Sequence, residues 1–345
     1  MRVLHLHEDL SLSGGAEVYL KDLLRRQSFR GLQVSLLEIK GLSGRRILKR
    51  ALKAEVLHLH GVYYRTSPLI LYLLSRLRPT LLTLHEVVNF CPRLTMTPPD
   101  GGLCLSPAGL HCLRRCGLPG RRAVLADLRR HALKRAVLKR LPLICAPSRF
   151  VYNLLRHFGF PRRILKRLPL YLPVPESWHQ VSVSPRLPKE RLRLAYLGGN
   201  SRGKGAFFLR EALAELKVPY QLLAPGLWGS RPLPRERLLR LFLSSQVCVM
   251  PSLAPESFGL AGLEAAFFGC VVLASCPGGP KDWLTKGGFL FPRGNKEVFI
   301  ALLTRLFREK ELLLKLSSEA RDLALSLSDP TTHLKALQTI YETLL

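Results

Sequence analysis

Residues 251–275 read PSLAPESFGLAGLEAAFFGCVVLAS. A Pro-Ser turn follows the apolar run Val247–Met250, and a loop with Glu256 leads into a helical stretch that carries Glu264. Eight residues make a little over two helical turns, so we expect both carboxylates on one face, with Glu264 partly exposed to solvent. Backbone N–H groups at 258–260 would be available there to an anion or to hydroxyl groups. The arrangement would suit a ligand with both phosphate and hydroxyl groups, such as a nucleotide sugar, but from spacing alone a solvated Glu at a helix start and a second Glu by chance are the simpler alternative.

The rest of the chain predicts two α/β domains. Its 345 residues exceed what one core usually supports, and 47% of them are hydrophobic. Short apolar strands alternate with helical stretches, as in doubly wound parallel sheets. We expect an N-terminal domain at 1–170, a proline-bearing linker at 171–190, a C-terminal domain at 191–327, and a last helix at 328–345 that packs back on the first domain. The expected strands are 3–7, 34–39, 56–60, 80–84 and 143–146, then 192–197, 220–224, 247–250 and 271–274.

A glycine-rich loop, Gly198–Gly205, follows the strand expected at 192–197. It departs from the P-loop pattern because Gly205 stands where a hydroxyl would hold Mg²⁺. The strand expected at 247–250 also offers no aspartate for such a metal. We therefore interpret the loop as a turn whose flexible backbone approaches a diphosphate, with Lys204 adding a positive charge.

Residues 251–275 resemble the E-x7-E signature of retaining glycosyltransferases of family 4, among the glycosyl transferases group 1. The resemblance implies the GT-B fold, in which two Rossmann-like domains face each other across a cleft. The loop at 198–205 is similar to the family's G-R-L-x3-K-G phosphate loop, with Lys204 at the family lysine. Gly199 stands at the usual arginine position, and Arg202 would compensate from the same loop.

The N-terminal half resembles the same family at several points. Gly14 and Gly15 match a glycine-rich loop whose backbone faces the transferred sugar and the acceptor. Thr83–Glu86 matches the T-x-H-D element, in which the histidine, here His85, reaches the donor sugar. For His60, at the end of an H-x-H strand, a ligand-binding role and a structural role both stay open.

The resemblance implies a hexosyl-type transfer from a nucleotide-diphosphate sugar to a lipid-linked or polysaccharide acceptor. Anomeric configuration would be retained, and the chemistry would need no metal. Glu256 would accept hydrogen bonds from the sugar and Glu264 from the ribose, while Lys204 neutralises the diphosphate. The candidate catalytic residues are His85, Lys204 and Glu256, and the candidate donor-binding residues are Gly14, Gly15, Gly199, Arg202, Lys204, Ser257, Phe258, Gly259, Leu260 and Glu264.

The formal net charge of +29 is concentrated in the first half. Residues 1–180 hold 31 Lys and Arg against 10 Asp and Glu, a balance of +21, while residues 181–345 hold 22 against 14, a balance of +8. The stretch 121–140 mixes cations with apolar residues at helical spacing. Such a helix can lie on an anionic lipid surface with its cations, among them Arg129, Arg130, Lys134 and Arg135, around an apolar stripe. An ordinary solvated helix face is the alternative.

Two other function classes remain open. One is a non-catalytic basic protein of the same fold that binds lipid or polysaccharide. The other is a nucleic-acid-binding protein, although zinc-finger spacing, RNP-like aromatic sequences and a helix-turn-helix pattern are missing. The start MRVLHLHEDL does not read as a signal peptide, and no apolar run predicts a membrane span. We expect a cytoplasmic protein, peripheral on the inner face of the cell membrane.

Four of the eight cysteines fall in one loop, at 91–116. Cys112 and Cys116 have a spacing that can supply two thiolates to one tetrahedral ion, and Cys91 and Cys104 would complete a structural zinc site. A loop rich in Pro and Gly has little core of its own, so a metal would explain its order. Free thiols and a disulfide are the alternatives. An insertion that begins C-P-R also resembles one in a subset of the family.

Overall fold

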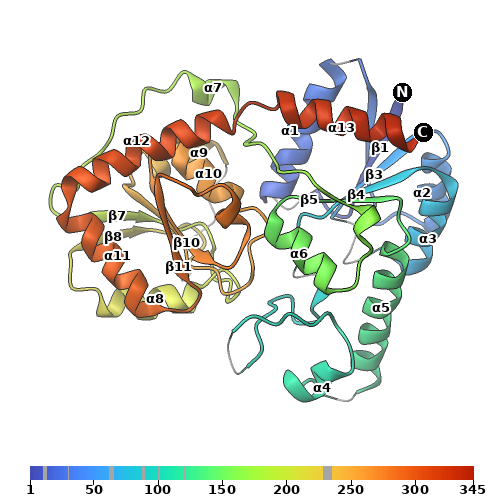
Figure 1. Cartoon of the computed structure of the whole chain (residues 1–345), viewed down its shortest axis with the longest axis horizontal. Coiled ribbons are helices and arrows are strands. Elements are labelled where there is room, and N and C mark those ends of the chain that lie inside the picture. Colours follow the sequence, from blue (N-terminus) through green and yellow to red (C-terminus); the bar gives the residue numbers. More distant parts are fainter. Residues whose placement is uncertain are drawn as a thin grey trace. The chain divides into compact units, whose positions relative to one another are not determined.

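The computed structural model describes residues 1–10, 14–29, 31–61, 66–87, 90–99, 102–119, 121–227 and 235–345. The chain divides into two compact units (Figure 1). The first comprises Met1–Asp100, Cys104–Leu170 and Thr331–Leu345, and the second comprises Gly101–Leu103 and Tyr171–Pro330. Each unit holds one parallel sheet, which confirms the predicted fold class of two Rossmann-like domains. In the described part of the chain, no helix has both the length and the apolar character to cross a bilayer.

The first unit is built on a six-stranded sheet of order β2-β1-β3-β4-β5-β6, in which every pairing is parallel. Three of its inner strands, β1, β3 and β4, are almost entirely buried, as their near-continuous apolar runs predict. The bounds are β1 Arg2–His7, β2 Gln33–Glu38, β3 Val56–His60, β4 Thr80–Thr83, β5 Leu143–Ala146 and β6 Leu165–Arg167. Strand β6 escaped the sequence analysis because only one of its three residues is buried.

The helices of the first unit begin where serine side chains cap them. Ser43, Ser67 and Ser148 each accept a hydrogen bond from a backbone N–H of the first turn, at the starts of α2, α3 and α6. The bounds are α1 Gly15–Phe29, α2 Gly44–Ala51, α3 Pro68–Leu77, α4 His111–Arg115, α5 Arg122–Leu138, α6 Arg149–His157, η2 Arg162–Ile164 and α13 Thr331–Leu344.

Helix α13 comes from the end of the chain and belongs to the first unit. The phenol of Tyr341 is fully buried and contacts Gln27 on α1 and His58 on β3. Leu337 and Ile340 lie on the same buried side of the helix. The core of this unit is therefore completed by a segment that begins at Thr331, more than 160 residues after Leu170, where the preceding part of the unit ends.

The second unit has a five-stranded sheet of order β11-β10-β9-β7-β8. Helices α10 and α12 cover one face, and α8 and α11 cover the other (Figure 1). The strands are β7 Leu192–Ala195, β8 Tyr220–Leu223, β9 Val247–Met250, β10 Val271–Cys276 and β11 Gly288–Pro292. The helices are α7 Glu176–His179, α8 Ala206–Glu215, α9 Arg235–Leu243, α10 Leu260–Phe267, η3 Gly279–Asp282, α11 Lys296–Arg308 and α12 Lys310–Ser326.

The strand order of the second unit reverses at β7. The chain runs from β7 to β8 on one side and then returns to β9 on the other side of β7. In open parallel sheets, ligands bind outside the carboxyl ends of the strands at such a reversal. The loops that follow β7 and β9 are the two glycine-bearing stretches singled out above, Gly198–Gly205 and 251–259. The topology therefore places both at one position.

The basic stretch 121–140 forms α5, but not all its cations face solvent. Arg129 is exposed, whereas Lys134 is buried with only 2% of its surface accessible. Burial lowers the pKa of Lys134 to about 8. Arg135 donates a hydrogen bond to the carbonyl oxygen of Ala108, at 3.1 Å. The prediction that these cations surround a lipid-facing stripe is therefore wrong for Lys134, because helical spacing alone does not say which side packs.

Leu337→Ala should destabilise the first unit by about 2–5 kcal/mol, because it removes a fully buried side chain from α13. Lys335→Ala, on the exposed side of the same helix, is the matched control and should change stability by less than about 0.5 kcal/mol. Urea unfolding, followed by hydrogen exchange of β1 and β3, measures both effects. Equal stability of the two variants would show that α13 does not close this core.

Candidate functional site

The loops after β7 and β9 are in direct contact. The backbone N–H of Ala254 donates to the carbonyl oxygen of Gly203 at 2.7 Å. Gly205 precedes α8 in the left-handed region, with a φ of 84°, and a Cβ there would overlap the carbonyl oxygen of Pro251. Glycine is therefore required at Gly205, where a P-loop would have a hydroxyl residue. The two stretches singled out separately in the sequence therefore lie against each other.

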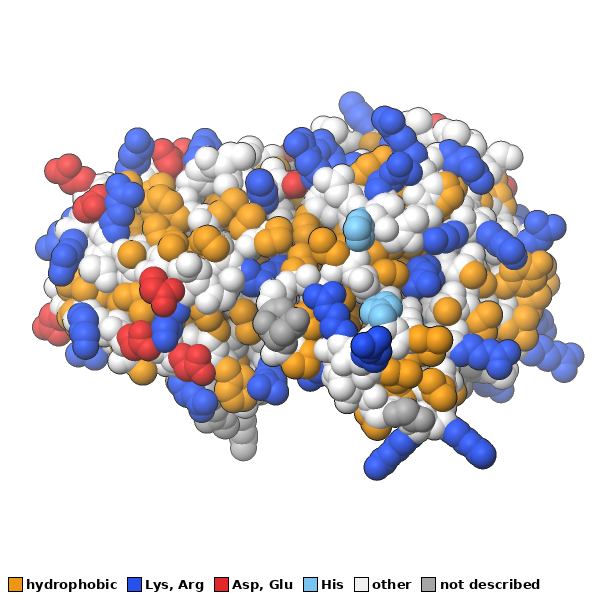
Figure 2. All heavy atoms as spheres, turned by 60° about the horizontal axis from the view of Figure 1, so that its bottom comes forward, with side chains coloured by type: hydrophobic (Ala, Val, Ile, Leu, Met, Phe, Trp, Pro, Cys, Tyr) orange, Lys and Arg blue, Asp and Glu red, His pale blue; other side chains and the backbone are white. Residues whose placement is uncertain are grey.

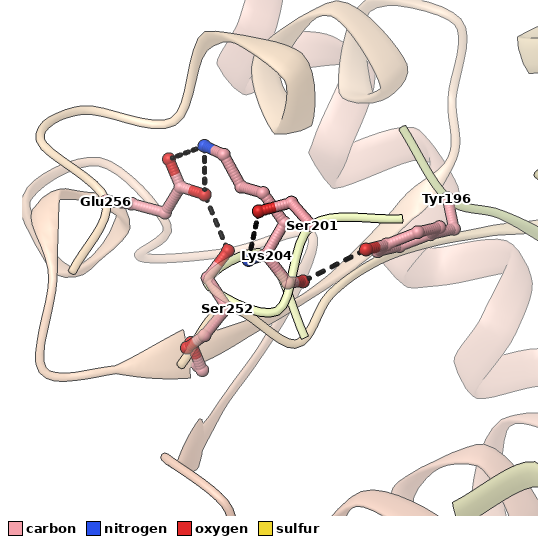
Figure 3. A network of polar contacts seen from close by, with 6 residues as sticks. Tyr196, Ser201, Lys204, Ser252 and Glu256 are labelled. Atoms are coloured by element: carbon pink, nitrogen blue, oxygen red, sulfur yellow. Dashed lines mark hydrogen bonds and ion pairs between the residues drawn. The ribbon is translucent and has the colours of Figure 1, made fainter. Parts of the chain in front are cut away.

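An ion pair joins the two loops at their centre (Figure 3). Lys204 Nζ lies 2.8 and 3.0 Å from the two carboxylate oxygens of Glu256, and Ser252 Oγ donates to the same carboxylate at 2.6 Å. Burial alone would raise the pKa of Glu256, but the charge of Lys204 and the hydrogen bonds from Lys204 and Ser252 outweigh it and lower that pKa. Glu256 is therefore ionised at neutral pH.

The lysine end of the pair remains open to solvent. The Lys204 side chain is 51% exposed, whereas the Glu256 side chain is 14% exposed. The pair is therefore half exposed, with its ammonium group accessible from solvent and its carboxylate also held by Ser252. An incoming anion can therefore bind the ammonium group and leave the carboxylate to accept hydrogen bonds from hydroxyl groups.

Residues that were not predicted from the sequence support this pair. The buried Tyr196 donates its O–H to the carbonyl oxygen of Lys204 at 3.3 Å, and Lys204 N–H donates to Ser201 Oγ at 3.3 Å (Figure 3). Burial raises the pKa of Tyr196, so it stays a neutral donor. Tyr196 follows β7 directly, and an aromatic residue at a strand end gave no signal of this role.

Arg293 is a further residue that was not predicted. It follows β11, and its guanidinium donates to the carbonyl oxygens of Leu253 and Pro277. Within the described residues, its buried Nε has no hydrogen-bond partner. Burial lowers the pKa of Arg293 to about 10, so it remains a cation, and its charge helps to lower the pKa of Glu256. Because β11 was not predicted, no local pattern singled out an arginine at its end.

The structure corrects the predicted geometry of the two glutamates. Helix α10 begins at Leu260, after Gly259 in the left-handed region with a φ of 92°, so Glu256 lies in the preceding loop. The two carboxylates therefore do not share a helix face. Glu264 is only 4% exposed, not partly solvated as expected, because α10 packs between β9, β10 and α12 and buries seven of its eight residues.

The other candidates in this unit lie around the same loops. The N-terminal side of α10 is held rigidly, since Gly279 N–H donates to the carbonyl oxygen of Glu256 at 2.7 Å and Trp283 Nε1 to that of Phe258 at 2.7 Å. Ser257 lies against Gly279, where a Cβ would overlap its carbonyl oxygen. Gly199 has a φ of 52°, and the Arg202 guanidinium lies over the Phe207 ring at 5.3 Å.

Gly14, Gly15 and His85 belong to the first unit. The Gly14 N–H donates to Glu17 Oε2 at 2.9 Å, and residues 11–13 of that loop lie outside the described residues. His85 follows β4, and its Nε2 lies 3.0 Å from His60 Nδ1. Burial, reinforced by neighbouring histidines, lowers the pKa of His85 to about 3, so its ring is neutral.

The cysteine loop is described except for residues 100 and 101. All four cysteines are free thiols, three of them buried and Cys116 half-buried. Burial raises the pKa of Cys112 and Cys116, and the remaining thiols of the loop add to the effect. The loop is anchored to α5 by apolar contacts of Ala108 and Cys112 with Leu128. Among the described residues, three ligand atoms lie within 4.8 Å of one another in His5, His58 and His60, and not in these cysteines.

Comparison with known proteins supports the fold. Residues 230–323 match the family described as glycosyl transferases group 1. No curated protein sequence matches the chain. Among solved structures, sucrose-phosphate synthase from Thermosynechococcus elongatus is similar with a TM-score of 0.71 at 15% identity, covering 100% of this chain and 99% of that one.

Two further structures agree. HepE of Anabaena, solved in complex with UDP-glucose, has a TM-score of 0.71 at 15% identity and covers 99% of this chain and 100% of its own. WaaG, a glycosyltransferase involved in lipopolysaccharide biosynthesis, has a TM-score of 0.66 at 13% identity and covers 97% and 99%. At such identities the likeness concerns the fold. The chain therefore has the GT-B fold, and its residues 230–323 match the glycosyl transferases group 1 family.

Proposed function

We propose that this protein transfers a hexosyl group from a nucleotide-diphosphate sugar to an acceptor, with retention of anomeric configuration. The observation that carries the proposal is the Lys204–Glu256 ion pair at the reversal of strand order in the second unit. It offers a cation for a diphosphate and a carboxylate for sugar hydroxyls at one position. HepE, which shares the fold, was solved in complex with UDP-glucose, and this supports the donor class. Retention rests on the resemblance of residues 251–275 to the E-x7-E signature.

The chemistry would use charges supplied by the chain. As the bond between sugar and diphosphate breaks, negative charge accumulates on the diphosphate, and Lys204 and Arg293 would stabilise it. Glu256, released from Lys204, would accept hydrogen bonds from the sugar hydroxyls and so orient the ring. Two cations beside one diphosphate perform the charge neutralisation that a divalent metal performs in other enzymes, so we propose metal-independent transfer. Glu264 would hold the ribose from inside α10, and His85 would contact the sugar.

A groove on the first unit supports a lipid-linked acceptor. It has a volume of about 460 Å³ and is mostly apolar. Its lining residues are Pro68, Leu125, Ala126, Arg129, Arg130 and Leu133. Leu69, Tyr72, Leu125 and Leu133 expose large apolar surfaces on α3 and α5. Arginines beside apolar surface suit an anionic lipid, with its chain in the groove and its phosphate on the cations.

The distribution of charge agrees with a membrane surface on this side. Most acidic side chains visible in Figure 2 lie on the part formed by the second unit, whereas Lys and Arg are spread over both parts. WaaG, of the same fold, acts in lipopolysaccharide biosynthesis, which supports an acceptor of the cell envelope. We propose that the protein acts at the inner face of the cell membrane, and that nucleic acid is not a partner.

We also propose that the cysteine loop binds a structural zinc ion. Four thiols lie in one short loop, where burial raises the pKa of Cys112 and Cys116 and the neighbouring thiols add to the effect, a situation that a divalent cation relieves. Cys91, Cys104, Cys112 and Cys116 would provide the four ligands, with Zn–S distances of about 2.3 Å. Because the thiols are not at ligand distance here, zinc binding would draw the loop closer together. Its role would be to order the loop, not to take part in transfer.

Lys204→Ala should weaken binding of the nucleotide sugar by about 10- to 100-fold, since charge-assisted hydrogen bonds to the diphosphate are lost. Glu256→Gln should leave nucleoside-diphosphate binding unchanged or tighter, because Lys204 is freed, while transfer falls steeply. A thermal-shift screen of nucleotide sugars selects the donor, and calorimetry and product analysis then measure both steps. Lys296→Ala, which removes a surface ion pair with Glu215 in the same unit, is the control. Unchanged binding by Lys204→Ala would refute the site.

Replacing Arg129 and Arg130 by Gln should weaken binding to anionic vesicles by about 30-fold, from about 1 kcal/mol for each cation near the surface. The loss should shrink at high salt. Replacing Arg308 and Lys310, exposed cations of the second unit, changes the net charge equally and serves as the control. Sedimentation with vesicles measures binding. An equal loss in both pairs would mean that the total charge, and not this groove, attracts lipid.

Protein purified without chelator should contain about one zinc ion per chain, as a closed four-thiolate site requires. The double change Cys112→Ser and Cys116→Ser should abolish it and raise protease sensitivity within the loop, whereas Cys276→Ser should keep it. Elemental analysis and limited proteolysis provide the two readouts. A metal-free protein with an equally resistant loop would contradict the proposal.

A further inference from the structure

The first unit contains a chain of hydrogen-bonded side chains that leads to His85. Gln27 Oε1 lies 2.8 Å from His5 Nε2, and His5 Nδ1 lies 3.1 Å from His60 Nε2. His60 Nδ1 in turn lies 3.0 Å from His85 Nε2. Gln27, His5 and His60 are buried on α1, β1 and β3, so this chain runs from the core to the carboxyl ends of the strands.

The three histidines of this hydrogen-bonded chain, His5, His60 and His85, are neutral. Burial lowers the pKa of His5 to about 4 and that of His85 to about 3, and it lowers the pKa of His60 well below its ordinary value. A neutral imidazole has one N–H donor and one acceptor nitrogen. Once one ring has its hydrogen on a given nitrogen, its other nitrogen accepts, and the neighbouring ring must donate to it. The group that contacts His5 at the buried end therefore sets the direction of every hydrogen bond in the chain.

Tyr341 sets the direction of the hydrogen bonds at the buried end of the chain, beside Gln27. Its hydroxyl oxygen lies 2.6 Å from His58 Nδ1. This distance is typical of a hydrogen bond donated by a hydroxyl group and is shorter than most hydrogen bonds donated by an N–H group. The Tyr19–His333 pair has the same 2.6 Å distance, and its direction is independently fixed. His333 Nδ1 lies 2.8 Å from the carbonyl oxygen of Pro169, which only accepts, so His333 Nε2 must accept from Tyr19.

The orientation of the Gln27 amide follows. Tyr341 donates its only hydrogen to His58, so its oxygen accepts from Gln27 Nε2 at 3.0 Å. The amide oxygen of Gln27 then faces His5 and accepts from His5 Nε2–H. His58 accepts at Nδ1, so its single N–H is on Nε2 and donates to Thr83 Oγ1 at 2.8 Å, and His58 stays outside the chain.

We propose that Gln27 is a positioning residue that fixes the tautomer of His85 through His5 and His60. His5 donates to Gln27, His60 donates to His5, and His85 donates from Nε2 to His60. The Nδ1 of His85 is thereby kept as an acceptor, suited to the hydroxyl group of a ligand. The ligand class rests on the proposed function, whereas the tautomer does not.

The same residues include the three histidines His5, His58 and His60, whose nitrogens lie close enough for a metal ion. All six of their ring nitrogens, however, have hydrogen-bond partners. A metal would have to displace at least two of these bonds and bring a charge into a neutral, buried site. The arrangement is therefore that of a hydrogen-bonded chain.

The tautomers can be measured directly in the unmodified protein. A long-range ¹H–¹⁵N correlation spectrum of ¹⁵N-histidine protein distinguishes protonated from unprotonated ring nitrogens, and His85→Gln identifies the His85 signals. We expect hydrogen on Nε2 and none on Nδ1 in His5, His60 and His85. Hydrogen on Nδ1 in these rings would mean that the amide points the other way and would overturn the proposal, as would a metal bound to them.

Gln27→Met tests the origin of the effect, since it keeps the side-chain length and removes both polar atoms. Both tautomers of His85 should then be populated, and sugar transfer should fall about three- to tenfold for the loss of one neutral hydrogen bond. Gln338→Met, on the outer side of α13, is the matched control. If Gln27→Met does not fold, Tyr341→Phe makes the same test by removing the hydroxyl that orients the amide. A single, unchanged His85 tautomer in the tested variant would refute the role of Gln27.

The two proposals fail separately. A fixed Nε2–H tautomer without any turnover of nucleotide sugars would refute the proposed function and leave this inference standing. Turnover together with the opposite tautomer would do the reverse.

Discussion

The ion pair of Lys204 and Glu256 depends on the close approach of two loops from neighbouring strands. That approach is possible because Gly205 lacks the Cβ that would overlap the carbonyl oxygen of Pro251. A side chain at this position would separate the loops and move the ammonium away from the carboxylate. The contact between Ala254 and Gly203, and the support of Lys204 by Tyr196, depend on the same approach. One steric constraint therefore sets the geometry of the whole candidate site.

The key side chains of the two units differ in their charge. In the second unit, charged groups meet at the site, and Lys204 and Arg293 keep Glu256 ionised there. In the first unit, the buried histidines His5 and His60 are uncharged, since burial lowers their pKa. Neutral imidazole rings in a row can fix one another's tautomers, because each ring has one donor and one acceptor nitrogen. A charged loop can bind and release an anion, because its ion pair is half exposed.

The fold class and the second-unit site could be predicted from sequence because both depend on local patterns. Buried parallel strands read as apolar runs, and Gly198–Gly205 and Glu256 stand in stretches with recognisable spacing. Arg293 and Tyr196 could not be found this way. Each reaches the site by lying at the end of a strand, and the strand order that brings those ends together has no local signature. The burial of Glu264 and Lys134 was missed for a related reason, since helical spacing gives a periodicity but not the packed side.

The sequence by itself determined the alternation of strands and helices, the glycines at the loops and the family resemblance, because hydrophobic period and backbone freedom are properties of short segments. Only the tertiary structure decided which distant residues meet. Tyr341 reaches Gln27 and His58 across 314 and 283 positions, and this contact orients the amide that sets the histidine chain. Hydrogen-bond direction depends on every partner in the chain at once. For that reason no single stretch of sequence contains it.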